Sequence, residues 1–196
     1  MNSWSQVTIP SLKQGLELPQ LSLSDTASAA KKLVEKKSVY RMYVCGITPY
    51  DATHLGHAAT YLTFDLINRY LRLSGQTVEF VENITDIDDP LFERAKRDNQ
   101  SWSELGNSQI ALFESDMTSL RILPPKNYVS VTEAMPSIIS AIELLVRKGN
   151  TYELSGNIYF RIAPYLAELP VNPDEAQRIF AERGGDPQRP GKENAL

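Results

Sequence analysis

Residues 40–85 constrain the fold more than any other part of the chain, because two strand patterns flank a helix pattern there. YRMYVCG, at 40–46, is aromatic and β-branched and ends at a glycine, which predicts a buried strand. Apolar side chains repeat at helical spacing over 56–74, and Gly75 is a typical residue after a helix. TVEFVENIT, at 77–85, predicts the second strand. This order predicts a right-handed βαβ unit with parallel strands, an α/β architecture common among nucleotide-binding proteins.

The sequence after this unit predicts three helices and a small β element. DDPLFERAKRD should form a short helix with Asp89 as its N-cap and Pro90 at its first position. Longer helices are expected over 107–120 and 132–148, with LPPKNY at 123–128 as a break. NTYELSGNIYFRI predicts a hairpin that turns at its SG pair. The final stretch, ERGGDPQRPGKENAL, contains no predicted closing element, as expected of a chain that is cut within a loop.

Composition excludes several classes of protein. With 42% hydrophobic residues and no apolar run near the ~20 residues that span a bilayer, the chain should be soluble and globular, with no membrane partner. Met1 does not begin a signal peptide. A single cysteine cannot form an internal disulfide, so we expect a cytoplasmic protein. A net charge of -4 provides no general attraction to nucleic acids.

The stretch CGITPYDATHLGH, at 45–57, is the candidate site, because it holds the only cysteine and both histidines of the chain. His54 and His57 could ligate a metal ion together with Cys45. Alternatively, the two imidazoles could bind a polyphosphate at the helix N-terminus, where free backbone amides favour anions. In that case Gly56 would let a base or phosphate come close. In a third interpretation one histidine caps the helix and the other is an ordinary surface residue. Spacing alone leaves the three open.

The strand, loop, HxGH and helix arrangement resembles the signature of class I aminoacyl-tRNA synthetases, whose histidine motif binds ATP during amino-acid adenylation. MYVCGITPYDATHLGHA and ENITDIDD are similar to its cysteine-activating branch. That branch comprises cysteinyl-tRNA synthetases and the related cysteine:glucosaminyl-inositol ligases of mycothiol biosynthesis. His57 and Pro49 favour the ligases, because the tRNA synthetases usually have asparagine and a valine-like residue there. ERGGDP, at 182–187, resembles a second ligase motif, and the resemblance covers about 41–192.

The resemblance implies an α/β fold that begins with the first half of a class I synthetase Rossmann-like nucleotide-binding domain with parallel strands. Part of an inserted α+β domain should follow. We therefore expect an N-terminal segment at 1–38, the first half of the catalytic domain at 39–128, and the start of the inserted domain at 129–196. The KMSKS loop and the remaining zinc ligands of such enzymes do not occur in the sequence. This implies an N-terminal portion that binds zinc poorly and catalyses little by itself.

Site residues follow from the resemblance position by position. Cys45 is implied to be a zinc ligand whose metal binds the sulfur of substrate cysteine, against the alternative of a small buried hydrophobe. His54 and His57 would stabilise charge on the phosphates of ATP, which binds with magnesium. The positions implied to hold nucleotide or adenylate are Cys45, Gly46, Ile47, Thr48, Gly56, Thr60, Asn83, Ile84 and Thr85. For Thr60 the alternative is a hydrogen bond within the helix. Asp86, Asp88 and Asp89 invite a magnesium interpretation, but helix capping explains them better.

The implied reaction joins cysteine to ATP as cysteinyl adenylate and then transfers it to the amine of glucosaminyl-inositol, forming an amide and releasing AMP and diphosphate. The expected partners are cysteine, ATP and glucosaminyl-inositol, and the full-length protein should be monomeric. Two alternatives stay open: a fragment of a cysteinyl-tRNA synthetase, for which a nucleic acid would be a partner, and a non-catalytic nucleotide-binding paralogue.

Overall fold

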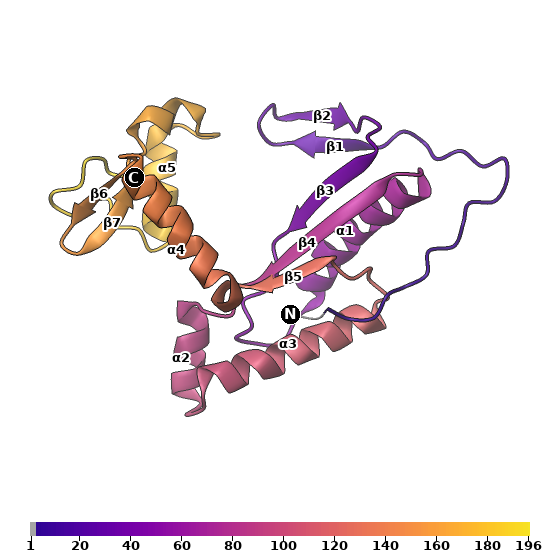
Figure 1. Ribbon diagram of the computed structural model, residues 1–196, viewed down its shortest axis with the longest axis horizontal. Coiled ribbons are helices and arrows are strands. Elements are labelled where there is room, and N and C mark those ends of the chain that lie inside the picture. Colours follow the sequence, from indigo (N-terminus) through magenta and orange to yellow (C-terminus); the bar gives the residue numbers. More distant parts are fainter. Residues whose placement is uncertain (1–2) are drawn as a thin grey trace. The chain divides into compact units, whose positions relative to one another are not determined.

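The computed structural model describes residues 3–196, which form two compact units (Figure 1). The first unit contains residues 3–21 and Leu33–Met135. The second contains Ser22–Lys32 and Pro136–Leu196. Within residues 3–196, no helix combines the length and the apolar character needed to cross a membrane. The sequence-based boundaries after residues 38 and 128 stay predictions.

The first unit is built on a parallel sheet of three strands in the order β3-β4-β5. Strand β3 (Val39–Val44) pairs with β4 (Thr77–Ile84), and helix α1 (Leu55–Leu73) connects them. The predicted strand–helix–strand unit with parallel strands is therefore confirmed. Strand β5 (Asn127–Ser130) pairs with β4 and was not predicted. It has only four residues and runs directly into the next helix, so its alternation is too short to recognise within the expected break.

Strand β3 is less buried than the sequence indicated. Only Val44 in this strand is buried, and Tyr43 is 61% exposed. The prediction of a buried strand was wrong because β3 lies at the edge of the three-stranded sheet. One sheet face carries the hydrophobic core, whereas the face with Arg41 and Tyr43 stays open to solvent in the described part of the chain.

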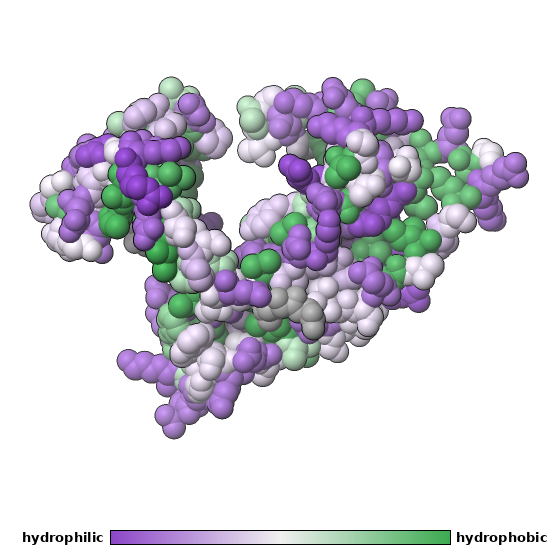
Figure 2. Space-filling view, viewed as in Figure 1, coloured by the Kyte–Doolittle hydropathy of each residue, from purple (hydrophilic) through white to green (hydrophobic). Residues whose placement is uncertain are grey.

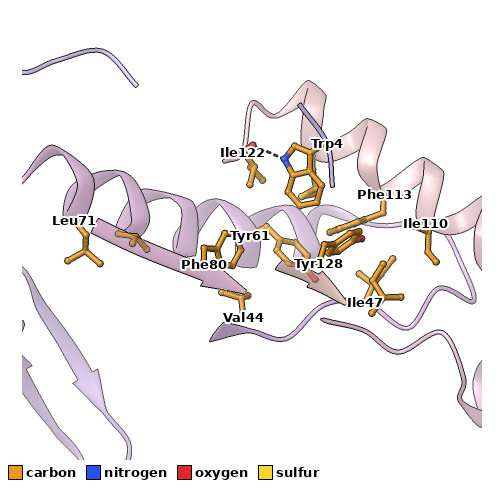
Figure 3. Packing of buried hydrophobic residues seen from close by; sticks show 13 residues of the cluster. Trp4, Val44, Ile47, Tyr61, Leu71, Phe80, Ile110, Phe113, Ile122 and Tyr128 are labelled. Atoms are coloured by element: carbon orange, nitrogen blue, oxygen red, sulfur yellow. Dashed lines mark hydrogen bonds between the residues drawn. The ribbon is translucent and has the colours of Figure 1, made fainter. Parts of the chain in front are cut away.

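An aromatic cluster forms the centre of the core (Figure 3). Trp4 makes edge contacts with Phe113 and Tyr128 at centroid distances of 5.8 and 5.7 Å. Its Nε1 donates a hydrogen bond to the carbonyl oxygen of Ile122 at 2.8 Å. Tyr61 of α1 contacts Phe113 at 5.1 Å. Trp4, for which the sequence predicted no role, therefore completes the core.

The helices after β4 differ from the predictions at their starts. Helix α2 (Asp89–Arg97) is capped by Asp88, whose carboxylate accepts a hydrogen bond from Asp89 N at 2.9 Å. The prediction of Asp89 as N-cap was wrong by one residue, because Asp88 has the extended backbone of a cap. Helix α3 (Trp102–Ser119) begins five residues earlier than expected. Helix α4 (Val131–Arg147) agrees with its prediction within one residue at each end.

The second unit contains two small two-stranded sheets and a C-terminal helix. Strands β1 (Ser22–Asp25) and β2 (Ala30–Leu33) form one sheet, and β6 (Thr151–Leu154) with β7 (Asn157–Phe160) forms the predicted hairpin. A 3₁₀ helix, η1 (Ala163–Glu168), and α5 (Pro173–Glu182) follow; α5 was not predicted. None of the residues from 136 to 196 is buried, and apolar residues stay visible on the surface of this part (Figure 2). The second unit thus has no core of its own.

Candidate functional site

The candidate site lies where β3 ends and α1 begins. A cavity of about 280 Å³ occurs there, lined by Gly46, Ile47, Thr48, Tyr50, Asp51, Ala52, Thr53, His54 and His57. Ligands of parallel α/β sheets bind at the carboxyl ends of the strands, and a helix N-terminus favours anionic groups. The structure therefore brings both predicted histidines and three of the predicted loop residues to one cavity at this edge.

His54 and His57 cap the first turn of α1 reciprocally. His54 is the N-cap residue, and its Nδ1 accepts a hydrogen bond from Gly56 N at 3.0 Å. His57 Nδ1 accepts a hydrogen bond from His54 N at 3.2 Å, and the two ring centroids are 4.1 Å apart. Such a capping box satisfies amide groups that a helix start otherwise leaves free. Both histidines, not one of them, thus belong to the cap.

These hydrogen bonds assign the proton within each imidazole. A ring nitrogen that accepts a hydrogen bond carries no hydrogen, so each neutral ring holds its proton on Nε2. Burial, and secondarily the nearby His54, lower the pKa of His57 from its ordinary value, which favours the neutral ring. Two Nε2–H donors therefore stand at the positive end of α1, an arrangement that suits phosphate oxygens.

Gly56 is required by the cap itself. A Cβ at this position would lie 2.8 Å from His54 Cε1 and 2.9 Å from His54 Nδ1. A side chain would therefore push the His54 ring away from the amide to which it bonds. In this structure the room left by the glycine is filled by the His54 ring.

Gly46 is held at the end of β3 by the neighbouring strand. Its amide donates a hydrogen bond to Asn83 Oδ1 at 3.1 Å, and the Tyr43 hydroxyl donates to the same oxygen at 2.8 Å. A Cβ on Gly46 would lie 1.6 Å from the Asn83 carbonyl oxygen, so no other residue fits without backbone movement. Asn83 Nδ2 also donates to Thr85 Oγ1 at 3.3 Å. Sequence reasoning included Gly46, Asn83 and Thr85 but missed Tyr43, although Tyr43 precedes Cys45 by two residues and shares its strand face.

Three side-chain contacts fix the loop between β3 and α1 to the helices around it. Thr48 Oγ1 donates to Asp88 Oδ2 at 3.4 Å, and Thr53 Oγ1 donates a short hydrogen bond to Asp116 of α3. Asp51 forms an ion pair with Arg94 of α2 at 3.0 Å. The hydrogen bond from Ala52 N, and then the Arg94 charge, lower the pKa of Asp51. The loop is thus held in place before any ligand binds, by partners that the sequence pattern did not reveal.

The remaining predicted residues lie at the same edge but offer different groups. The side chains of Ile47 and Ile84 are buried in the core, so only their backbone atoms can reach a ligand. Ile47 O accepts a hydrogen bond from Thr85 N at 3.0 Å. Thr60 Oγ1 donates to Gly56 O at 3.0 Å, which is the helix hydrogen bond considered as its alternative.

The described residues do not fit a complete zinc site. Cys45 is exposed, so its interpretation as a buried small hydrophobe was wrong. Within residues 3–196, no group of three or more His, Cys, Asp or Glu side chains is placed to hold a metal ion. Of the acidic residues after β4, Asp88 caps α2, and Asp86 accepts hydrogen bonds from Thr132 N and Thr132 Oγ1.

Glu82 lies buried beneath the candidate site. Its side chain is 0% exposed, and within residues 3–196 neither carboxyl oxygen has a hydrogen-bond partner. Burial raises its pKa to about 8, so the carboxyl group is mainly protonated at neutral pH. A Cβ on Gly46 would lie 3.5 Å from Glu82 Cγ, which places this group directly below the loop.

The sequence has clear relatives over its entire length. Residues 30–189 match the family described as tRNA synthetases class I (C) catalytic domain. An L-cysteine:1D-myo-inositol 2-amino-2-deoxy-alpha-D-glucopyranoside ligase 2 from Corynebacterium jeikeium is 50% identical over 204 residues, and a ligase of the same name, without the number, from Thermomonospora curvata is 50% identical over 202 residues. Each alignment covers 100% of this chain and 49% of the relative. The chain spans about half the length of the curated relatives it matches.

The fold also has a counterpart among solved structures. Mycobacterium tuberculosis methionyl-tRNA synthetase in complex with methionyl-adenylate superposes with a TM-score of 0.53 at 17% identity. The superposition covers 76% of this chain and 36% of that one. It confirms the expected α/β fold of the class I synthetase type.

Proposed function

The chain belongs to the family of class I (C) tRNA synthetase catalytic domains, and we propose that it is the ATP-binding part of a cysteine ligase. In the proposed reaction the carboxylate of cysteine attacks the α-phosphorus of ATP and diphosphate leaves. The amine of glucosaminyl-inositol then attacks the carbonyl carbon of the adenylate, loses a proton, forms the amide and expels AMP. Support for these substrates comes from the names of relatives that are 50% identical.

The residues of the candidate site would contribute by binding and orienting the nucleotide. The Nε2–H groups of His54 and His57 donate to phosphate oxygens, and the first amides of α1 add a positive end to the same cavity. Because contacts to Asp88, Arg94 and Asp116 already fix the loop, the donors need little rearrangement when charge develops on the departing diphosphate.

The reciprocal histidine cap is the observation that carries this proposal. It orients both imidazoles through Nδ1 and leaves Nε2 as the donor on each ring, at the carboxyl edge of a parallel sheet. A purely structural cap needs only a short polar residue such as Ser, Thr, Asp or Asn. Two adjacent imidazoles in this position fit anion binding better.

Several finer expectations belong to the same proposal. Cys45 would supply one zinc ligand, and magnesium would accompany ATP; no step above depends on either metal. We further propose a monomeric, cytoplasmic enzyme with no membrane partner. The net charge of -4 supports a small-molecule acceptor over tRNA.

The test is an exchange assay on the full-length polypeptide that contains this chain. Cysteine-dependent exchange of labelled diphosphate into ATP should occur, and glucosaminyl-inositol should then release AMP. His54→Asn keeps a capping side chain but removes the Nε2–H donor, so exchange should fall about 100-fold. Thr63→Ala, on the exposed side of α1, serves as the control.

Two results would contradict the proposal. Absence of exchange in the wild type would exclude cysteine activation and favour the non-catalytic paralogue. Exchange accompanied by charging of tRNA, with no consumption of glucosaminyl-inositol, would favour the cysteinyl-tRNA synthetase alternative.

A further inference from the structure

A second cavity, of about 260 Å³, lies at the same edge of the sheet, and none of the residues predicted for the site lines it. Asp86 follows the end of β4, and Thr132 lies at the start of α4, just after β5. The first turns of α3 supply Trp102, Ser103 and Asn107. The cavity thus occupies the carboxyl ends of β4 and β5, whereas the histidine cavity occupies the carboxyl end of β3.

The side chains around this cavity are acidic, neutral and aromatic, and no basic side chain of residues 3–196 lines it. A carboxylate, two hydroxyl groups, an amide and an indole can bind an ammonium group and sugar hydroxyls. A phosphate or carboxylate ligand would instead face the Asp86 charge without a cation to balance it. The lining therefore favours a cationic, polyhydroxylated small molecule over an anion such as the end of a tRNA.

Asp86 is held in place with acceptor capacity to spare. Its Oδ1 accepts from Thr132 N at 2.9 Å, and its Oδ2 accepts from Thr132 Oγ1. A carboxylate has about four acceptor positions, so roughly half remain for a ligand. Among the ion pairs of residues 3–196, none involves Asp86. Its orientation is thus set by Thr132, and no cation of the described residues forms an ion pair with it.

Trp102 offers an exposed indole that is also held in place. The side chain is 39% exposed, and an edge contact with Phe92 of α2 positions the ring, at a centroid distance of 5.5 Å and an interplanar angle of 85°. The other tryptophan, Trp4, is only 7% exposed. An indole face beside a carboxylate favours a cation through both its quadrupole and its apolar surface.

The two cavities are connected by packed residues. Gly106 lines the second cavity, and a Cβ there would lie 3.9 Å from Cγ of Pro49, a buried residue of the histidine loop. Thr48 of the same loop bonds to Asp88, two residues after Asp86. The second cavity therefore borders the loop that we propose to hold the nucleotide.

We propose that the cavity lined by Asp86, Trp102, Ser103, Asn107 and Thr132 binds the amino-sugar acceptor through its ammonium group. Asp86 pairs with the ammonium and accepts the proton that the nitrogen must lose before it attacks, the indole of Trp102 covers the sugar ring, and Ser103 and Asn107 bond to hydroxyl groups. This inference rests on the proposed function, because it assigns the acceptor of that reaction to a place in the fold.

Tryptophan fluorescence tests the binding directly. Titration of the 196-residue chain with glucosaminyl-inositol should change the emission in a saturable way and protect Trp102 from acrylamide quenching. Inositol, which lacks the amine, should bind at least 10-fold more weakly. Asp86→Asn keeps an acceptor for Thr132 but removes the charge, and should weaken glucosaminyl-inositol binding at least 10-fold. Glu104→Gln removes a charge from the same turn of α3 outside the cavity and should bind like the wild type. No saturable change in the wild type, or equal binding by Asp86→Asn, would overturn the inference.

Exchange assays separate this inference from the proposed function. In the full-length polypeptide, Asp86→Asn should keep cysteine-dependent diphosphate exchange and raise KM for glucosaminyl-inositol at least 10-fold. Normal exchange with an unchanged KM would overturn the acceptor site alone. Failure of exchange in the wild type would overturn the proposed function instead.

Discussion

Glu82→Gln should stabilise the first unit at neutral pH. Glutamine has nearly the same shape as a protonated glutamate, and it is neutral in both the folded and the unfolded state. The Glu82 carboxyl group is fully buried without a partner in the described residues, and burial raises its pKa from an ordinary value of 4.5 to about 8. Folding at pH 7 therefore requires the carboxylate of the unfolded chain to take up a proton.

The sign and size of the effect follow from proton linkage. Below pH 4.5 both states are protonated, and Glu82 adds no pH dependence. Between pH 4.5 and 8 the folded state binds more protons than the unfolded state, so stability falls as pH rises, by up to about 1.4 kcal/mol per pH unit. Above pH 8 the loss levels off. At pH 7 the expected cost is roughly 3 kcal/mol, which Glu82→Gln removes, whereas at pH 4 the two proteins should be nearly equal in stability.

Urea denaturation between pH 4 and 8 measures this difference. The fluorescence of Trp4 reports on the same core, and a Trp102→Phe background removes the exposed indole signal. Glu79→Gln is the matched control, because Glu79 lies on the same strand, faces the other side and pairs with Lys126. Parallel pH profiles for wild type and Glu82→Gln, or a Gln variant that is less stable at pH 7, would refute the reasoning.

Three further predictions concern the site and the second unit. Gly46→Ala should lower the free energy of unfolding, measured by urea titration, by about 3 kcal/mol or more, because its Cβ would meet the Asn83 carbonyl oxygen. Gly75→Ala is the control: it is strained only in φ and should lower the free energy of unfolding by about 1 kcal/mol. His54→Ala should cost about 1 kcal/mol through loss of the cap, whereas equal stability of His54→Asn and His54→Ala would speak against the capping role. Limited trypsin digestion should cut within 136–196 before 39–130, because no residue of that part is buried; the reverse order by mass spectrometry would contradict this.

Periodic patterns among neighbouring residues predicted the local structure well. The alternation and helical spacing of residues 40–85 led to β3, α1 and β4, because each element is recognised by the period of its own side chains. The same alternation contains a signal that was not used. Glu82 stands in register with Val78, Phe80 and Ile84, which marks a carboxyl group on the core face of the strand.

The errors occurred where several residue types fitted equally well or where the element was short. Asp88 and Asp89 are equally good capping residues by type, and only the extended backbone of Asp88 decides between them. Strand β5 has only four residues, and it pairs with β4, which lies more than 40 residues earlier in the sequence. Local patterns do not reveal such a pairing. The link between Trp4 and Ile122 joins residues 118 positions apart, which no local period can indicate.

In the candidate site, too, some features were determined by the sequence and others by the tertiary structure. The sequence alone determined that one cysteine, two histidines and a glycine-containing turn follow a strand and begin a helix, because these residues are covalent neighbours. Only the tertiary structure decided which nitrogen of each imidazole accepts the capping hydrogen bond, that Asn83 from the next strand holds Gly46, and that a residue of a second cavity packs beside Pro49. Such contacts depend on how separate elements pack against each other, and packing is set by the whole core and not by any one segment.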